Sequence, residues 1–112
     1  MKRIAMLTCL NATAICSSGG CFKAFNNRDK TFEIYKGEDV ELCAFFHCNG
    51  CGCDYENDEA FHEKLDRIIS MNLDSVHKGV CTFPKGNECE VIKKISERLE
   101  KSGVKIIKGT HQ

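Results

Sequence analysis

The chain has 112 residues, the usual size of one compact domain, and 42% of them are hydrophobic while 29% are charged, as in soluble globular proteins. Its 16 basic and 16 acidic residues cancel, and no basic stripe is present, so the charge pattern does not predict binding to nucleic acid or to an anionic membrane. The apolar stretch at residues 4–7 is too short for a secretory signal, and no apolar stretch is long enough to span a bilayer. We therefore expect a single domain over residues 1–112, located in the cytoplasm.

Strand-like and helix-like patterns alternate along the chain. Short apolar runs predict strands, and amphipathic segments with a period of 3.6 residues predict helices. In chain order we expect a strand at residues 3–8, a short helix at 18–26, strands at 31–35 and 40–46, a helix at 58–71, a short strand at 74–77, a helix at 88–101 and a strand at 104–108.

Two of these expectations depend on local patterns. At residues 31–35, Phe32 and Ile34 alternate with Glu33, which is typical of a strand with one buried face. Before the last helix, Asn87 and Glu90 have the spacing of a capping box, in which each side chain bonds to the other residue's backbone amide.

Alternating strands and helices predict a parallel sheet with right-handed crossover connections. The fold class that we expect is therefore α/β: a single three-layer, flavodoxin-like domain with a mostly parallel sheet of four to five strands and helices on both faces. In such sheets, ligands bind outside the carboxyl ends of the strands, near the point where the strand order reverses.

Nine cysteines are present, and several of them directly follow a predicted strand. Cys9, Cys48 and Cys81 each come after an apolar run, and His111 follows the last one. An odd number of cysteines fits a disulfide framework poorly, and the cytoplasm keeps thiols reduced, so this density indicates metal, cluster or redox chemistry. We expect these side chains to form one thiolate-rich site at the carboxyl edge of the sheet.

The most recognisable motif is Cys48-Asn49-Gly50-Cys51, a C-x-x-C pair that Cys53 extends by one more thiol. Two thiolates at this spacing can bind one metal ion, because a tight turn brings both sulfur atoms within tetrahedral reach. Zinc ribbons contain two such pairs and this chain contains one, so the remaining ligands must come from elsewhere in the fold.

The other cysteines differ in their predicted positions. Cys16 and Cys21 flank the start of the first helix, where the helix dipole favours the thiolate, and ligand and structural roles suit them equally well. Cys89 opens the last helix, and Cys43 lies inside a strand, where a free cysteine packs as a small hydrophobe. The candidate metal ligands are Cys9, Cys16, Cys21, Cys48, Cys51, Cys81, Cys89 and His111.

The four histidines separate by position. His111 follows the last strand at the expected ligand edge and is the best candidate ligand, while His47 adjoins the C-x-x-C pair and comes second. We expect His62 to be solvated on the polar side of its helix and His77 to have a structural role in a short strand.

Together these residues resemble the CGGC-domain family, small prokaryotic proteins rich in cysteine and histidine. The resemblance spans nearly the whole chain. It rests on residues 44–51, on the early series Cys9, Cys16 and Cys21, on the later pair Cys81 and Cys89, and on residues 109–111. The resemblance implies metal binding, zinc being the usual suggestion for the family. Asn49 departs from the glycine of the family motif, but both sulfur atoms and Gly50 remain.

The leading hypothesis is therefore a protein that holds zinc or an iron–sulfur cluster through cysteine thiolates. Zinc needs four ligands, for example Cys9, Cys48, Cys51 and Cys81, and nine cysteines exceed that number, which leaves a cluster or two metal ions open. Such a protein could exchange metal or electrons with a protein partner.

Other functions fit the sequence less well. A thiol/disulfide oxidoreductase using Cys48 and Cys51 is the main alternative, although the next helix starts too far along the chain to activate Cys48. Phosphatase-type chemistry would require an arginine at the position of Ile15, six residues after Cys9. A flavin-binding module would use residues 17–20 as its phosphate loop, which is a weak match.

Overall fold

The computed structural model describes residues 1–50, 54–83 and 86–111. The strands are β1 (Lys2–Thr8), β2 (Val40–His47), β3 (Ser75–Lys78) and β4 (Lys105–Lys108), and the α-helices are α1 (Gly19–Asn27), α2 (Glu59–Ile69) and α3 (Glu90–Lys101). Short 3-10 helices follow β1, α1 and β3: η1 (Asn11–Ala14), η2 (Lys30–Tyr35) and η3 (Val80–Thr82). Within the described residues, no helix is both long and apolar enough to cross a membrane.

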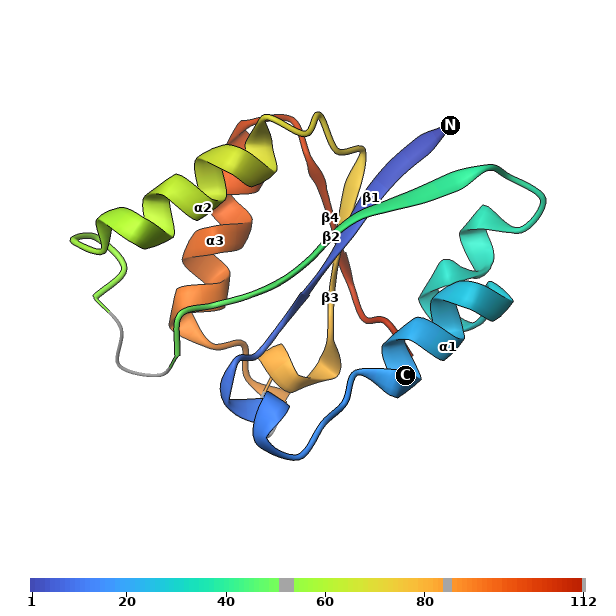
Figure 1. Cartoon of the computed structure of the whole chain (residues 1–112), viewed down its shortest axis with the longest axis horizontal. Helices are drawn as coiled ribbons and strands as arrows, with labels where there is room; N and C mark the ends of the chain where they lie inside the picture. Colours follow the sequence, from blue (N-terminus) through green and yellow to red (C-terminus); the bar gives the residue numbers. More distant parts are fainter. Residues whose placement is uncertain (51–53, 84–85, 112) are drawn as a thin grey trace.

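The strands form one sheet in the order β2-β1-β3-β4, and every neighbouring pair is parallel. This is the first part of the flavodoxin-like order, with β1 and β3 in the centre. Helix α1 covers one face of the sheet, and α2 and α3 cover the other (Figure 1). The expected three-layer α/β fold is confirmed.

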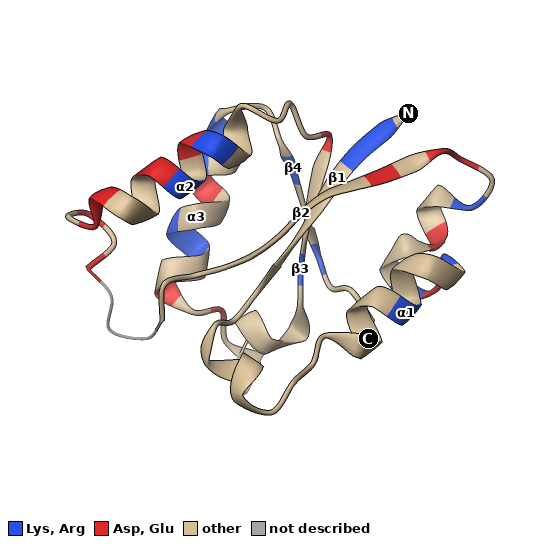
Figure 2. Cartoon of the chain, viewed as in Figure 1, with Lys and Arg blue, Asp and Glu red and all other residues tan. Residues whose placement is uncertain are grey.

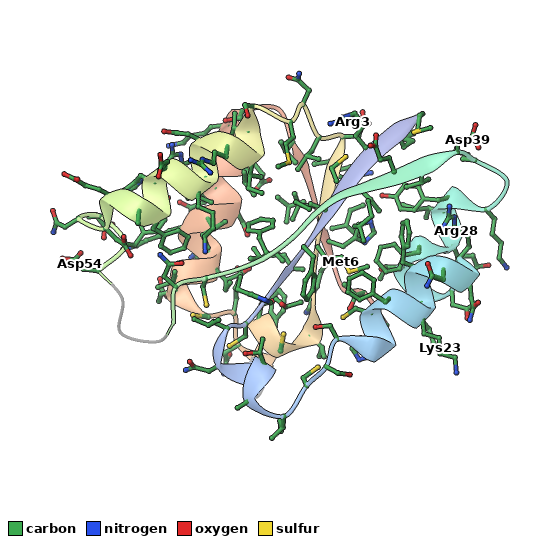
Figure 3. All side chains as sticks on the ribbon, in the orientation of Figure 1. Arg3, Met6, Lys23, Arg28, Asp39 and Asp54 are labelled. Atoms are coloured by element: carbon green, nitrogen blue, oxygen red, sulfur yellow. The ribbon has the colours of Figure 1, made fainter. Side chains whose placement is uncertain are left out.

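The central strand β1 supplies side chains to both layers of the core. Ile4 and Met6 pack with residues of α1 and η2 on one face, and Ala5 and Leu7 pack with α2 and α3 on the other. All four are fully buried, because successive side chains of a strand point to opposite faces and both faces are covered. Figure 3 shows Met6 directed toward the layer that contains α1.

The expected strand at residues 31–35 is wrong, because this segment forms the 3-10 helix η2. A 3-10 helix has three residues per turn, so Phe32 and Tyr35 lie on the same side and are buried. Ile34, expected to face the core, is 60% exposed. The aromatic residues at a spacing of three, rather than the alternation at a spacing of two, determine which face is buried.

The start of α3 also differs from the expected capping box. Cys89 is the N-cap residue and no side chain caps the helix, so Asn87 and Glu90 do not form the reciprocal pair. In contrast, α2 begins with a side-chain cap, since the Asp58 carboxylate accepts a hydrogen bond from the Phe61 amide at 3.0 Å. Cys89 therefore lies at the N-terminus of α3.

Two histidines pack within the fold. His62 is half-buried rather than solvated, because the guanidinium of Arg98 donates to its Nδ1 at 2.7 Å and the ring of Tyr55 packs against it. His77 on β3 is fully buried, with Tyr35 Oη 2.8 Å from its Nε2 and Thr31 Oγ1 3.1 Å from its Nδ1.

Burial lowers the pKa of His77 from 6.5 to about 4, so stability should depend on pH. Between pH 6.5 and 4 the unfolded chain takes up a proton at this residue while the folded protein does not. We expect the free energy of unfolding to fall by about 3 kcal/mol across this window and to be recovered above it. Denaturant titrations of the reduced protein as a function of pH would measure this.

The matched control is His77→Gln, which keeps a polar side chain on β3 but cannot titrate. Its free energy of unfolding should be lower at neutral pH and nearly flat between pH 6.5 and 4. Parallel pH profiles for the two proteins would contradict the assignment to His77.

Candidate functional site

The candidate site lies at the carboxyl ends of β1 and β3. The chain leaves β1 toward β2 on one side of the sheet, and leaves β3 toward β4 on the other, so the strand order reverses between these two neighbours. In open α/β sheets this reversal opens a crevice for ligands. Cys9 directly follows β1, and Cys81 lies in η3 directly after β3. The parallel pairing of the two strands therefore brings together thiols that are 72 residues apart.

The first cavity has a volume of about 130 Å³ and lies on the side of the sheet that α1 covers. Its walls come from the ends of β1, β3 and β4 and from the loop that enters α1. The candidate ligands that line it are Cys9, Cys16, Cys21, Cys81 and His111.

The second cavity, also about 130 Å³, lies toward α2 and α3. It is formed by the ends of β1, β2 and β3 and by the start of α3. The candidate ligands that line it are Cys9, Cys48, Cys81 and Cys89.

Cys9 and Cys81 are in direct contact. The backbone N–H of Cys9 donates to the sulfur of Cys81 at 3.2 Å. Burial raises the pKa of the Cys81 thiol, the Cys9 amide opposes this shift, and neighbouring thiolates at Cys9, Cys21 and Cys16 raise the pKa further. A cation bound among these sulfur atoms would favour the thiolate form of Cys81.

Gly79 allows the approach of β3 to β1 at this point. A Cβ on Gly79 would lie 3.3 Å from the Thr8 methyl group and 3.5 Å from the Cys81 sulfur. A Cβ there would require the Thr8 methyl group to shift by a few tenths of an ångström.

The end of the chain meets the start of α1. The sulfur of Cys21 lies 3.1 Å from Thr110 Oγ1 and 3.5 Å from His111 Nδ1. Gly20 permits this contact, because a Cβ there would lie 3.1 Å from the His111 ring. Cys16 is exposed, and its sulfur accepts a hydrogen bond from the Ser18 amide at 3.3 Å.

Asn49 fixes the loop that follows Cys48. Its side-chain amide donates to the Asp58 carboxylate at 3.0 Å, and its carbonyl oxygen accepts from the Lys64 ammonium at 2.6 Å. Lys64 also donates to the backbone oxygen of His47 at 2.7 Å. The hydrogen bond from Asn49 is the main cause that lowers the pKa of Asp58. Cys48 is thereby tied to the first turns of α2.

Among the described residues, no charged side chain lines either cavity. Residues 9–22 and 79–83 include neither acidic nor basic side chains, whereas both signs of charge cover the outer faces of α2 and α3 (Figure 2). Figure 3 shows sulfur atoms distributed along these loops. The donors available are therefore thiols and one imidazole rather than carboxylates.

Comparison with known proteins agrees with these features. The model of the CGGC domain family matches residues 3–111. The chain belongs to the CGGC domain family. It is 32% identical over 120 residues to an uncharacterized protein of Methanocaldococcus jannaschii, an alignment that covers 97% of this chain and 86% of the relative. No solved structure matches the chain.

In this CGGC-domain protein, every candidate ligand that the structure describes lines at least one of the two cavities. Cys51 and Cys53 lie outside the described residues. The seven described cysteines are free thiols.

Cys43, expected in the core, is half-buried in β2 and packs against the hydrophobic cluster under α2 and α3. It lines neither cavity. His47 lines neither cavity as well, since its Nδ1 lies 2.7 Å from Thr8 Oγ1.

The donor chemistry fits a soft metal ion, but the donors are not yet gathered around one point. Among residues 1–50, 54–83 and 86–111, no three Cys, His, Asp or Glu side chains stand close enough together to hold a metal ion. The sulfur atoms surround cavities instead. Binding of a metal would therefore draw the loops inward, and the assignment of each residue as a ligand stays a prediction.

Three residues of the site were not expected from the sequence. Thr110 is fully buried against Cys21, while Asn49 and Lys64 hold the loop after Cys48. Thr110 has no spacing pattern that could have identified it. The departure of Asn49 from the family's glycine was visible, but the sequence does not show that α2 folds back far enough to supply its partners.

Replacing Asn49 tests whether its hydrogen bonds stabilise the fold. Asn49→Ala leaves the Asp58 carboxylate and the Lys64 ammonium without this partner, so the free energy of unfolding should fall by about 1–2 kcal/mol. A thiol reagent should also modify buried Cys48 faster. Denaturant titration and the rate of thiol labelling would measure the two effects.

Asn57→Ala is the matched control, because the side-chain amide of Asn57 donates one exposed hydrogen bond of 2.8 Å, to the Asp54 carboxylate. It should change stability by no more than about 0.5 kcal/mol and leave the labelling rate unchanged. Equal effects of the two substitutions would show that Asn49 does not hold the loop.

Proposed function

We propose that this CGGC-domain protein binds a metal, either a zinc ion or an iron–sulfur cluster, through cysteine thiolates at the carboxyl edge of its sheet. The observation that supports the proposal most is the convergence of six cysteines and His111 on two neighbouring cavities between the strand ends. These residues come from six separate segments of the chain. Packing alone gives no reason for so many thiols to meet where the strand order reverses.

The kind of donor favours soft metals. Thiolate and imidazole ligands suit zinc and iron–sulfur clusters, whereas calcium and magnesium require oxygen ligands. Among the described residues, no Asp or Glu side chain lines either cavity. The free thiols also suit a reducing compartment, which makes the cytoplasm the location that we propose.

Residues of the chain would prepare the thiols for binding. Ligand cysteines must lose their protons, and the raised pKa of Cys81 means that binding at this residue releases a proton and strengthens as the pH rises. The Cys9 amide that points at the Cys81 sulfur favours the thiolate. Bound zinc would crosslink the strand ends, or exchange ligands with a protein partner if one coordination position stayed open.

The competing function is a thiol/disulfide oxidoreductase that uses Cys48 and Cys51. Cys48 is only 4% exposed, and α2 begins at Glu59, eleven residues after it. A C-x-x-C pair that exchanges disulfides must present its attacking sulfur to a partner, and a buried Cys48 does not do so.

Purification without oxygen, followed by elemental analysis and an absorption spectrum, separates these functions. We expect either stoichiometric zinc in a colourless protein, or iron and sulfide with broad absorbance near ~400 nm. A protein that contains no metal and takes up none on reconstitution would overturn the proposal and leave dithiol chemistry as the better account.

Cysteine variants locate the site. Cys48→Ser with Cys51→Ser should reduce the metal content, because both predicted ligands of the C-x-x-C motif are removed. Cys43→Ser is the control: Cys43 lines neither cavity, so the metal content should match that of the wild type. A loss of metal only in Cys43→Ser would place the site elsewhere.

A further inference from the structure

We propose, resting on the metal-binding function above, that the protein holds two metal ions that share Cys9 and Cys81 as bridging ligands. Each ion would occupy one of the two cavities. The thiolate-binding metals of this class include zinc and cadmium.

The two cavities are separate spaces, and each is lined by some donor residues that do not line the other, which we call its private donors. Cys16, Cys21 and His111 line only the first cavity, whereas Cys48 and Cys89 line only the second. The private donors belong to opposite layers of the fold. Cys21 is part of the core cluster under α1, while Cys48 is part of the cluster under α2 and α3 and Cys89 packs against it.

A single ion cannot use both sets of donors. Zinc–sulfur bonds are about 2.3 Å long, so all ligands of one ion must surround one point. The donors lie on opposite faces of the sheet, where Leu7 packs in one layer of the core and Met6 in the other. Donors separated in this way cannot surround one point. One ion would therefore leave the private thiols of the other cavity without a metal.

Cys9 and Cys81 are placed to serve both cavities. They lie at the ends of the two central strands, between the layers, and they alone among the seven described cysteines line both spaces. The contact of 3.2 Å from the Cys9 amide to the Cys81 sulfur holds the pair together. A thiolate has several lone pairs, so one sulfur atom can bind two ions at once.

Each cavity then has enough donors for a tetrahedral ion. The first offers four cysteines and a histidine, and the second offers four cysteines.

Cadmium NMR tests the proposal on the full chain. The reduced, metal-free protein is titrated with ¹¹³Cd²⁺ without oxygen, and the bound metal is counted by elemental analysis after removal of free ions. We expect about two cadmium ions per chain and two ¹¹³Cd resonances in the thiolate-rich range. Each resonance should be split by scalar coupling to the other ion through the shared sulfur atoms.

Three results would overturn specific parts of the account. One cadmium ion per chain at saturation, with one resonance, would overturn the second ion. Two resonances without mutual splitting would overturn the shared ligands. No binding of cadmium at all would overturn the metal-binding function itself. This outcome differs from the first two, in which the protein still binds metal.

Variants assign the ions to the cavities. Cys16→Ser with Cys21→Ser should remove one resonance, and Cys48→Ser with Cys89→Ser should remove the other, each leaving a single unsplit signal. Cys43→Ser should keep both. Loss of the same resonance in the two double variants would contradict the division into two cavities. The wild-type spectrum does not depend on the folding of any variant.

Discussion

The parallel pairing of β1 with β3 is the constraint on which the rest of the site depends. It places the carboxyl ends of the two central strands side by side, and with them Cys9 and Cys81. The crossover connections then leave in opposite directions, so a crevice opens at this edge and the neighbouring strands and helices deliver their own thiols to it. Gly79 matters because it lets the two strand ends approach each other.

The electrostatics of this edge follow from its composition. None of the described residues that line the cavities is an acid, a lysine or an arginine, and the pKa of the Cys81 thiol is raised mainly by burial. Among the residues that the structure describes, the sulfur atoms surround the cavities and no three ligands converge on one point. Metal binding and closure of the loops should therefore occur together.

Much of the fold could be predicted from the sequence, because the period of the apolar residues reports directly on helices and strands. The segment at residues 31–35 could not, since Phe32 and Tyr35 fit a 3-10 helix as well as Phe32 and Ile34 fit a strand, and packing against β1 and α1 decides between them. The gathering of thiols at one edge followed from the topology. Their division into two cavities did not, because it depends on which layer each loop enters, and local patterns do not contain that information.

X-ray absorption at the zinc edge of the metal-loaded protein tests the central claim most directly. If cysteine thiolates at the strand ends hold the metal, sulfur should dominate the first coordination shell at a distance of about 2.3 Å. A shell made only of nitrogen or oxygen atoms at about 2.0 Å would contradict the account, because it would place the metal on surface side chains rather than between the ends of β1 and β3.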